Sequence, residues 1–297
     1  DKEPLGFRGE VGETLEMLKS RGTPLVLGLR DVMDEPELLV PEWERKHVMP
    51  ALKDLYDELW VYGLPQFYDP LTGVEIPEDI RRKIVYTGYL KHQVPEALSV
   101  KSASVPNTPY ILVTAGGGGD GDILIDWVLT AYETGMKIPH PALIVLGPFM
   151  HTDHQESFLA RIEKLESVSA MTFSSHIEHL MEKAVGVVAM GGYNTFCEIL
   201  SFDKPSIIVP RTKPRLEQYI RASRAQELGL LSMLNYDNQP DPQTMATALC
   251  QLTQQNPPSE IILPGLLDGL QNINRLVSQN IAKSRRDELP KIDQLIS

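Results

Sequence analysis

The sequence predicts an α/β fold with parallel sheets. Short apolar runs alternate with helical patterns almost throughout its 297 residues, which indicates repeated strand–helix units. The runs are continuously apolar, as expected for strands buried on both faces of a sheet. Hydrophobic residues make up 42% and charged residues 23% of the chain, so it is able to bury the cores of two ordinary domains.

The first block, residues 1–90, holds three predicted strands, at 24–29, 58–63 and 83–88. Three strands correspond to the C-terminal half of a Rossmann-like domain, so we expect an incomplete N-terminal domain here. Asp31 follows the first of these strands, at the edge where a cleft would open. It is a candidate general base, and capping of the following segment is the alternative.

The rest of the chain divides into a linker, a second domain and a tail. Residues 91–109 lack periodicity and contain three prolines, which predicts an inter-domain linker. Residues 110–284 carry at least five strand–helix units, which predicts a complete Rossmann-like domain, and 285–297 form a polar tail. The strands predicted in the second domain span 110–115, 141–147, 169–173, 185–190 and 205–210.

The bulk composition argues against several classes of function. A net charge of −12 disfavours non-specific binding to nucleic acid or to an anionic membrane surface. No apolar run reaches the roughly 18 residues of a transmembrane helix. Two cysteines, Cys197 and Cys250, provide no disulfide framework. We therefore expect a cytoplasmic protein; a peripheral position at the inner membrane face and a homodimer stay open.

The first motif at a predicted strand end is "GGGGDG", residues 116–121. Its spacing, G-x-G-x-x-G between a strand and a helix, lets backbone N–H groups approach a phosphate. A tight turn that needs glycines for geometry alone is the alternative, and Asp120 and Asp122 add negative charge where a phosphate would bind. The acidic residue of an NAD site and the Lys-Ser pair of a Walker-type loop do not follow, so NAD is disfavoured and a Walker loop is excluded.

The second motif is "GGYNTFCE", which begins at Gly191. Its glycines end a predicted strand, and Asn194 and Thr195 begin a helix whose first N–H groups can bind an anion. Glu198 follows one turn later, where a carboxylate suits the two hydroxyls of a ribose. Alternatively, Asn194 or Thr195 caps the helix and Glu198 closes a capping box.

The third motif, "PRTKPRLEQYIRASR" at 210–224, follows the next predicted strand. It concentrates positive charge in an acidic chain, for which a solvated basic face is the usual explanation. Glu217 and Gln218 form an acid–amide pair suited to bidentate contacts with neighbouring sugar hydroxyls. The cations are Arg211, Lys213, Arg215, Arg221 and Arg224.

Together these motifs resemble a known family. The pattern Gly-Tyr-Asn-Thr-x-x-Glu at 192–198, followed about 20 residues later by Glu217-Gln218, is similar to the nucleotide-sugar signature of GT-B glycosyltransferases. Both the plant and antibiotic UDP-sugar transferases and the MurG-like enzymes carry such a segment. The stretches "GLRDVMDEP", "GGYNTFCEILSFDKPSIIVPR" and "PRLEQYIRA" look closest to a bacterial group of predicted MurG-related transferases. The resemblance implies a GT-B-like fold with two Rossmann-like domains.

The resemblance also implies roles for individual residues. Glu198 would bind the ribose, Glu217-Gln218 the donor hexose, and the loop after 169–173 the uracil edge, while both glycine turns hold the pyrophosphate. The implied donor-binding residues are Gly116, Gly117, Gly118, Gly119, Phe173, Ser174, Gly191, Gly192, Tyr193, Asn194, Thr195, Glu198, Arg211, Arg215, Glu217, Gln218 and Arg221.

Two positions depart from the family pattern. Met190 stands where many of these transferases place a phosphate-contacting histidine. Arg221 stands where MurG-like sequences carry an asparagine near the sugar. Arg211 or Arg215 would supply the positive charge that the missing histidine leaves to other residues.

The implied activity is that of a hexosyltransferase. It would move a hexose or N-acetylhexosamine from a UDP-sugar to a glycan, lipid or small-molecule acceptor, with inversion, with Asp31 as candidate base, and with no metal or cofactor. Asp120-Gly121-Asp122 has the spacing of a metal pair but lies in the predicted phosphate loop. Two alternatives stay open: a donor-binding subunit or inactive fragment that needs a partner, and an enzyme like the UDP-N-acetylglucosamine 2-epimerases, which share the fold.

Overall fold

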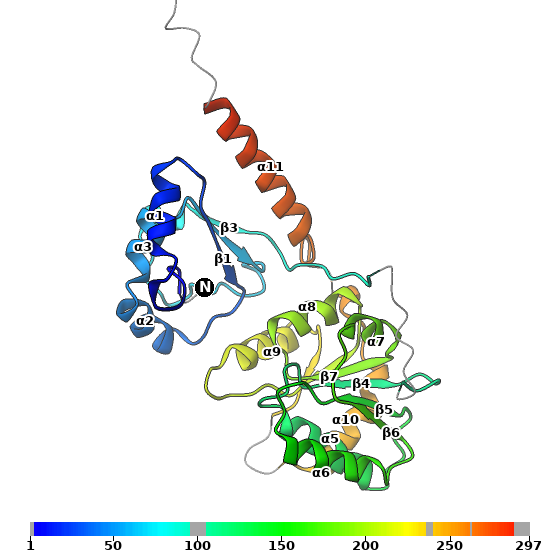
Figure 1. Cartoon of the computed structure of the whole chain (residues 1–297). Helices are drawn as coiled ribbons and strands as arrows, with labels where there is room; N and C mark the ends of the chain where they lie inside the picture. The colour runs from blue at the N-terminus through cyan, green and yellow to red at the C-terminus, as the bar shows by residue number, and fades with distance from the viewer. Residues whose placement is uncertain (1–2, 96–104, 236–239, 262, 288–297) are drawn as a thin grey trace, which may run out of the picture. The chain divides into compact units, whose positions relative to one another are not determined.

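The chain forms two compact units, each with its own parallel sheet (Figure 1). Unit 1 comprises Asp1–Leu90 and Pro264–Ser297, and unit 2 comprises Lys91–Leu263. The parallel sheets confirm the α/β class predicted from the alternating apolar runs. The computed structural model describes residues 3–95, 105–235, 240–261 and 263–287.

Unit 1 is built on a three-stranded sheet in the order β1-β2-β3. The strands coincide with the three apolar runs of the first block, and Val61 of the middle strand pairs with Leu29 and with Tyr86. Trp43 and Leu52, from two helices, belong to the same buried cluster as the strands. The elements are α1 Gly12–Ser20, β1 Val26–Arg30, α2 Pro36–Arg45, α3 Val48–Asp54, β2 Glu58–Tyr62, α4 Glu78–Arg81, β3 Ile84–Tyr86 and α11 Gly269–Asp287.

Helix α11 belongs to unit 1 because its first turn is bonded to the segment after β3. Gly269 donates its N–H to the carbonyl of Tyr89 at 3.1 Å, and Asn272 Nδ2 donates to the carbonyl of Thr87 at 2.8 Å. A Cβ at Gly269 would lie 2.6 Å from the carbonyl oxygen of Tyr89, so this close approach requires glycine.

The predicted domain boundaries differ from these units at two places. Residues 264–284, predicted as the end of the second domain, group with unit 1, because the apolar period of a helix does not tell which core receives it. Lys91 begins unit 2, so the described part of the predicted linker groups with the second sheet. Residues 96–104 of that linker and 288–297 of the predicted tail lie outside the described residues.

Unit 2 contains a six-stranded, all-parallel sheet in the order β6-β5-β4-β7-β8-β9. In chain order this is 3-2-1-4-5-6, the strand order of a doubly wound Rossmann-like sheet. The sequence predicts the first five strands and misses β9, which has only two residues. The elements are β4 Ile111–Thr114, α5 Asp122–Glu133, β5 Ala142–Val145, α6 Thr152–Ile162, β6 Val168–Met171, α7 Ile177–Lys183, β7 Gly186–Ala189, α8 Tyr193–Ser201, β8 Ser206–Ile208, α9 Glu217–Glu227, β9 Ser232–Met233 and α10 Pro242–Gln251.

Helices cover both faces of this sheet. Helices α5, α6 and α10 lie on one face, and α7, α8 and α9 lie on the other (Figure 1). Every residue of β4, β5 and β7 is therefore buried, which explains their continuously apolar sequences. Among the described residues, no helix combines the length and the apolar character needed to cross a membrane.

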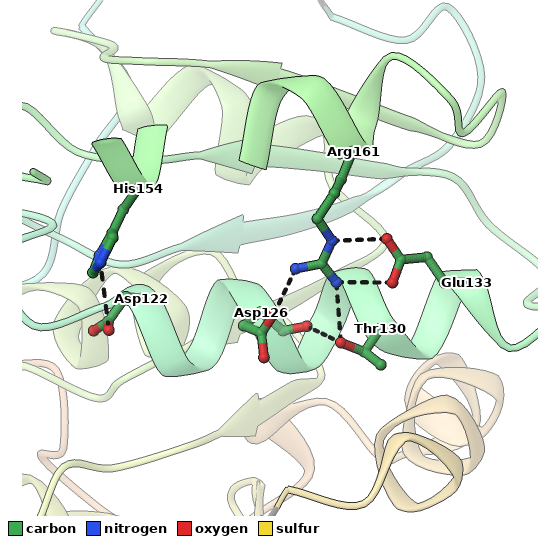
Figure 2. A network of polar contacts seen from close by, with 6 residues as sticks. All are labelled: Asp122, Asp126, Thr130, Glu133, His154 and Arg161. Carbon is green, nitrogen blue, oxygen red and sulfur yellow. Dashed lines mark hydrogen bonds and ion pairs between the residues drawn. The ribbon is translucent and has the colours of Figure 1, made fainter. Parts of the chain in front are cut away.

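A polar clasp joins α5 to α6 on the outside of the first face (Figure 2). Arg161 of α6 donates to both carboxylate oxygens of Glu133 at 2.8 Å, to Thr130 Oγ1 at 3.1 Å, and to Asp126. The hydrogen bonds from Arg161 hold the pKa of Glu133 below its ordinary value. Because the guanidinium is bidentate and has several partners, we expect the clasp to stabilise the unit more than an isolated surface pair would.

Replacing Arg161 tests the clasp. Arg161→Gln should lower the free energy of unfolding by about 1 kcal/mol, because partly exposed pairs contribute little each. The loss should shrink at about 1 M NaCl, where charges are screened. Arg161→Lys keeps the charge without the planar fork and should recover only part of the loss. Urea denaturation at low and high salt measures the free energy of unfolding of the wild type and both variants. Equal values for Arg161→Gln and wild type would show that the clasp contributes nothing to stability.

Candidate functional site

A cavity of about 260 Å³ opens at the C-terminal ends of β4 and β7. These strands are neighbours in the sheet, but the chain leaves them in opposite directions, toward β5 and toward β8. Ligands of doubly wound proteins bind at this reversal point, because the loops diverge there and leave a crevice. The cavity is lined by Thr114, Ala115, Gly116, Gly117, Asp120, Met190, Gly191, Gly192, Thr195, Arg211 and Gln218, and so brings residues of all three predicted motifs together.

The glycine-rich loop after β4 serves both packing and the cavity. A Cβ at Gly118, where φ is 86°, would lie 2.6 Å from a carbonyl oxygen in the loop after β5. A Cβ at Gly121 would lie 2.1 Å from that of Ala115. Geometry alone therefore requires these two glycines, as the turn alternative proposes. Gly116 and Gly117 line the cavity instead.

Helix α8 begins at the cavity. Its N-cap is Gly192, which has no side chain to occupy the N–H groups of the first turn, and Gly191 adopts a φ of 79° in the preceding turn. Asn194 and Thr195 lie within the helix, so the alternative in which one of them caps it is wrong. The positive end of the helix dipole thus lies at the cavity, where it favours an anionic ligand.

Arg211, in the loop after β8, brings a positive charge into the cavity wall. Its guanidinium donates to Glu217 Oε1 at 2.6 Å and to Asp120 Oδ2 at 2.9 Å. Its backbone N–H donates to Gln218 Oε1 at 3.1 Å. Two buried atoms of this group, Arg211 Nε and Glu217 Oε2, have no hydrogen-bond partner among the described residues. A ligand that both accepts and donates hydrogen bonds would satisfy them.

Arg221 supports the turn before α8 rather than the cavity itself. Its Nη1 donates to the carbonyl of Gly191 at 3.0 Å, and its guanidinium lies 5.8 Å from the centre of the Tyr193 ring. The residue is 1% exposed. A solvated basic face therefore does not explain Arg221, nor does it explain Arg211 in the cavity wall.

Glu198 lies one turn into α8, in a second polar group with His92 and Glu178. One candidate ligand atom from each residue lies within 4.8 Å of the others, so the group could hold a metal ion, and His92 Nδ1 is 3.9 Å from Glu198 Oε1. Burial, and secondarily the charge of Glu178, raises the pKa of Glu198 to about 7. His92 is fixed to α8 because its backbone N–H donates to Ser201 Oγ at 2.9 Å.

Asp31 and the predicted uracil loop do not line the cavity. Asp31 follows β1 in unit 1, and its Oδ2 accepts a hydrogen bond of 2.7 Å from the Tyr89 hydroxyl. Glu35, and not Asp31, is the N-cap of α2, so the capping alternative is wrong. Phe173 is 58% exposed in the loop after β6. The predicted donor residues that do not line the cavity are Gly118, Gly119, Phe173, Ser174, Tyr193, Asn194, Glu198, Arg215, Glu217 and Arg221.

Comparison with known proteins identifies unit 2. The model of the glycosyltransferase family 28 C-terminal domain matches residues 110–260, just over half of the chain. The chain belongs to glycosyltransferase family 28. Every residue that lines the cavity of this family 28 chain falls within the matched segment.

Solved structures similar to this family 28 chain are GT-B glycosyltransferases. MurG of Acinetobacter baumannii superposes with a TM-score of 0.59 at 12% identity, over 92% of this chain and 73% of MurG. UGT2 of Phytolacca americana, complexed with UDP-2fluoro-glucose and pterostilbene, gives 0.58 at 11% identity, over 90% of this chain and 74% of UGT2. VinC, in complex with DTDP, gives a TM-score of 0.56 at 16% identity, over 91% of this chain and 68% of VinC. These likenesses confirm the predicted GT-B fold.

A relative in sequence is an "Uncharacterized glycosyltransferase" of Methanosarcina acetivorans. It is 24% identical over 239 residues, which are 78% of this chain and 60% of that protein. The family 28 chain therefore spans about 60% of the length of the relative it matches.

Sequence reasoning misses three polar residues of this family 28 chain. Asp120 stands out in the sequence only as unwanted negative charge, and its pairing with Arg211 depends on two loops that are distant in sequence. His92 and Glu178 meet Glu198 only through the packing of the helices, so their spacing gives no signal. A carboxylate inside a phosphate-type glycine loop, matched by a surplus arginine after the strand that lies two positions away in the sheet, is the signal that could have indicated the first of these contacts.

Glu198→Gln tests the buried carboxyl group. Because the pKa of Glu198 is raised to about 7, the folded chain binds this proton more tightly than the unfolded chain. The free energy of unfolding of the wild type should therefore fall as the pH rises from about 5 to about 7 and then level off. The free energy of unfolding of the variant minus that of the wild type should therefore be larger at pH 8 than at pH 5. Thermal unfolding at both pH values measures this, and a pH-independent difference would contradict the shifted pKa.

Proposed function

We propose that the chain carries the donor site of a glycosyltransferase that moves a hexose or N-acetylhexosamine from a UDP-sugar to an acceptor. The observation that carries this proposal is the cavity that joins the glycine loop, the start of α8 and Arg211 at the reversal point of a family 28 sheet. Nucleotide phosphates bind at such places because backbone N–H groups and a helix dipole meet their charge. The nucleotide complexes of VinC and Phytolacca UGT2 support this choice of ligand.

The pyrophosphate is assigned to the start of α8 and to Arg211. Gly192 and Thr195 would present N–H groups to it, and Gly116 and Gly117 would cover it from the β4 side. Arg211 Nε, buried and without a partner among the described residues, would donate to a phosphate oxygen. Arg211 would thereby supply the charge that a histidine at the position of Met190 provides in related sequences.

The ribose is assigned to Glu198. Its side chain is largely buried, and no hydrogen bond to its carboxylate is found in the described part of the chain; His92 lies 3.9 Å away. A buried carboxylate without hydrogen bonds is costly. Two vicinal hydroxyl groups would satisfy its two oxygens.

The hexose is assigned to Glu217 and Gln218 at the start of α9. Glu217 Oε2 is buried and lacks a partner among the described residues, so it would accept a hydroxyl while Oε1 stays with Arg211. Gln218 uses its carbonyl oxygen on the N–H of Arg211, which leaves its amide N–H groups to donate to the sugar.

The proposed chemistry is a direct displacement at the anomeric carbon. The acceptor oxygen forms its bond to this carbon as the bond to the UDP oxygen breaks, which inverts the configuration, and the acceptor proton passes to a base. Asp31, the candidate from the sequence, is fully buried and accepts a hydrogen bond from Tyr89, so it is not assigned this role. Charge on the leaving UDP is met by α8 and Arg211, so we propose that no metal or cofactor takes part. Asp120 and Asp122 have the spacing of a metal pair, but their near partners differ: Arg211 and His154.

A second candidate function is that of a donor-binding subunit which needs a partner for turnover. It is favoured by the fact that every residue that lines the cavity lies in unit 2. Both candidates share the donor site. They differ in whether the chain alone transfers sugar to an acceptor, which a product assay with and without added partner decides.

A thermal-shift panel of nucleotides tests the donor class. UDP and UDP-sugars should raise the melting temperature more than uridine does, because binding to the folded state stabilises it and the pyrophosphate adds contacts. ADP, GDP and dTDP are the controls. Stabilisation by another nucleotide without any by UDP would overturn the assignment, and epimerised sugar formed without an acceptor would favour the epimerase-like alternative.

Arg211→Ala tests the phosphate role. We expect UDP to bind at least about tenfold more weakly, because a hydrogen bond from a charged group contributes about 1.5–3 kcal/mol. Lys213→Ala removes the same charge from the same loop, does not touch the cavity wall, and should leave the dissociation constant within about twofold. Calorimetric titration measures the dissociation constant of UDP for both variants. An equal loss of affinity in the two would mean that Arg211 acts only through its general positive charge.

A further inference from the structure

The carboxylate of Asp120 is hydrogen-bonded to Arg211 in the cavity wall. Asp120, in the glycine loop after β4, reaches Arg211 in the loop after β8, with 2.9 Å between Oδ2 and Nη1. Both residues line the cavity. The guanidinium therefore has a carboxylate partner on the side where a phosphate would bind.

Charge in this group is unfavourable for an anionic ligand. One guanidinium faces two carboxylates, those of Asp120 and Glu217. A pyrophosphate that approaches Arg211 would be repelled by two negative charges while it is attracted by one positive charge. A phosphate can accept from Arg211 Nε, which has no partner among the described residues, while both carboxylates stay. It gains Nη1 and escapes the repulsion only when Asp120 moves away.

The two carboxylates differ in how easily a phosphate can replace them as partners of Arg211. The side chain of Asp120 is 48% exposed, whereas that of Glu217 is 17% exposed and lies closer to the guanidinium. Water readily replaces the partner of an exposed ion pair, so little is lost when it opens. The aspartate also lies in a turn rather than in a helix, and it lines the cavity itself.

We propose that Asp120 is an internal substitute for the donor phosphate. It holds Arg211 when no donor is bound, gives way to the pyrophosphate, and returns when the nucleotide product leaves, while Glu217 stays on the guanidinium throughout. The inference rests on the proposed function, because it requires a phosphate on Arg211. It makes Asp120 a positioning residue that weakens the binding of phosphorylated nucleotides and eases product release.

The alternative role for Asp120 gives the opposite sign. If the aspartate only holds Arg211 in the geometry that a phosphate needs, then its removal disorders the arginine and weakens UDP binding. If it competes with the phosphate, its removal strengthens UDP binding and leaves the binding of uridine, which carries no phosphate, unchanged.

The experiment compares Asp120→Asn with Asp122→Asn by calorimetric titration of uridine and UDP. The control removes the same charge two residues away, from a side chain that is 44% exposed and lies 3.9 Å from His154. We expect Asp120→Asn to bind UDP about threefold to tenfold more tightly than wild type and uridine equally well. The control should stay within about twofold for both ligands.

A double variant shows whether the gain acts through the arginine. Asp120→Asn in the Arg211→Gln background should give no further gain in UDP affinity, because no guanidinium remains to be released. An equal gain in both backgrounds, or weaker or unchanged UDP binding by Asp120→Asn, would overturn the inference while leaving the donor site in place. A wild-type chain that does not bind UDP at all would instead overturn the proposed function, and the inference with it.

Discussion

The site depends on the pairing of β4 with β7 at the centre of the second sheet. Four consecutive residues of each strand are in register, from Ile111 opposite Gly186 to Thr114 opposite Ala189. Because the chain turns away from these strands in opposite directions, the diverging loops leave a cavity beyond their carboxyl ends. The strands position three loops at one edge, and each loop contributes a different chemistry: open backbone, a helix start and a guanidinium.

Tight packing fixes one of these loops before any ligand arrives. Gly118 and Gly147 touch through their backbones, and a Cβ on Gly147 would lie 2.7 Å from the Cα of its neighbour. Gly121 packs as closely on Ala115. The turn is therefore held by contacts that only glycine allows, and Gly116 and Gly117 are presented to the cavity at no further ordering cost. Packing and binding are requirements of the same glycine run, which is why its sequence alone leaves both interpretations open.

Local patterns predict the sheets and most of the cavity wall, and contacts between distant segments account for what they miss. The continuously apolar strands and the glycine and arginine loops are visible because each lies within a few consecutive residues. The place of α11 is not, because an amphipathic helix fits either core until Gly269 and Asn272 are seen bonded to the segment after β3. The contact of Asp120 with Arg211 and the group around Glu198 depend in the same way on sheet order, which a residue pattern does not encode.

The cavity contains carboxylates because its cation is an arginine and not a histidine. A histidine at the position of Met190 could lose its proton and would need no permanent counter-charge, whereas an arginine stays protonated under all ordinary conditions. Arg211 is only partly exposed, so its charge has to be met by the protein whenever no ligand meets it. Asp120 and Glu217 satisfy that requirement from two different loops. The proposed donor site, built around a permanent cation, thus contains its own anions, and we propose that the more exposed of them is the one that a phosphate replaces.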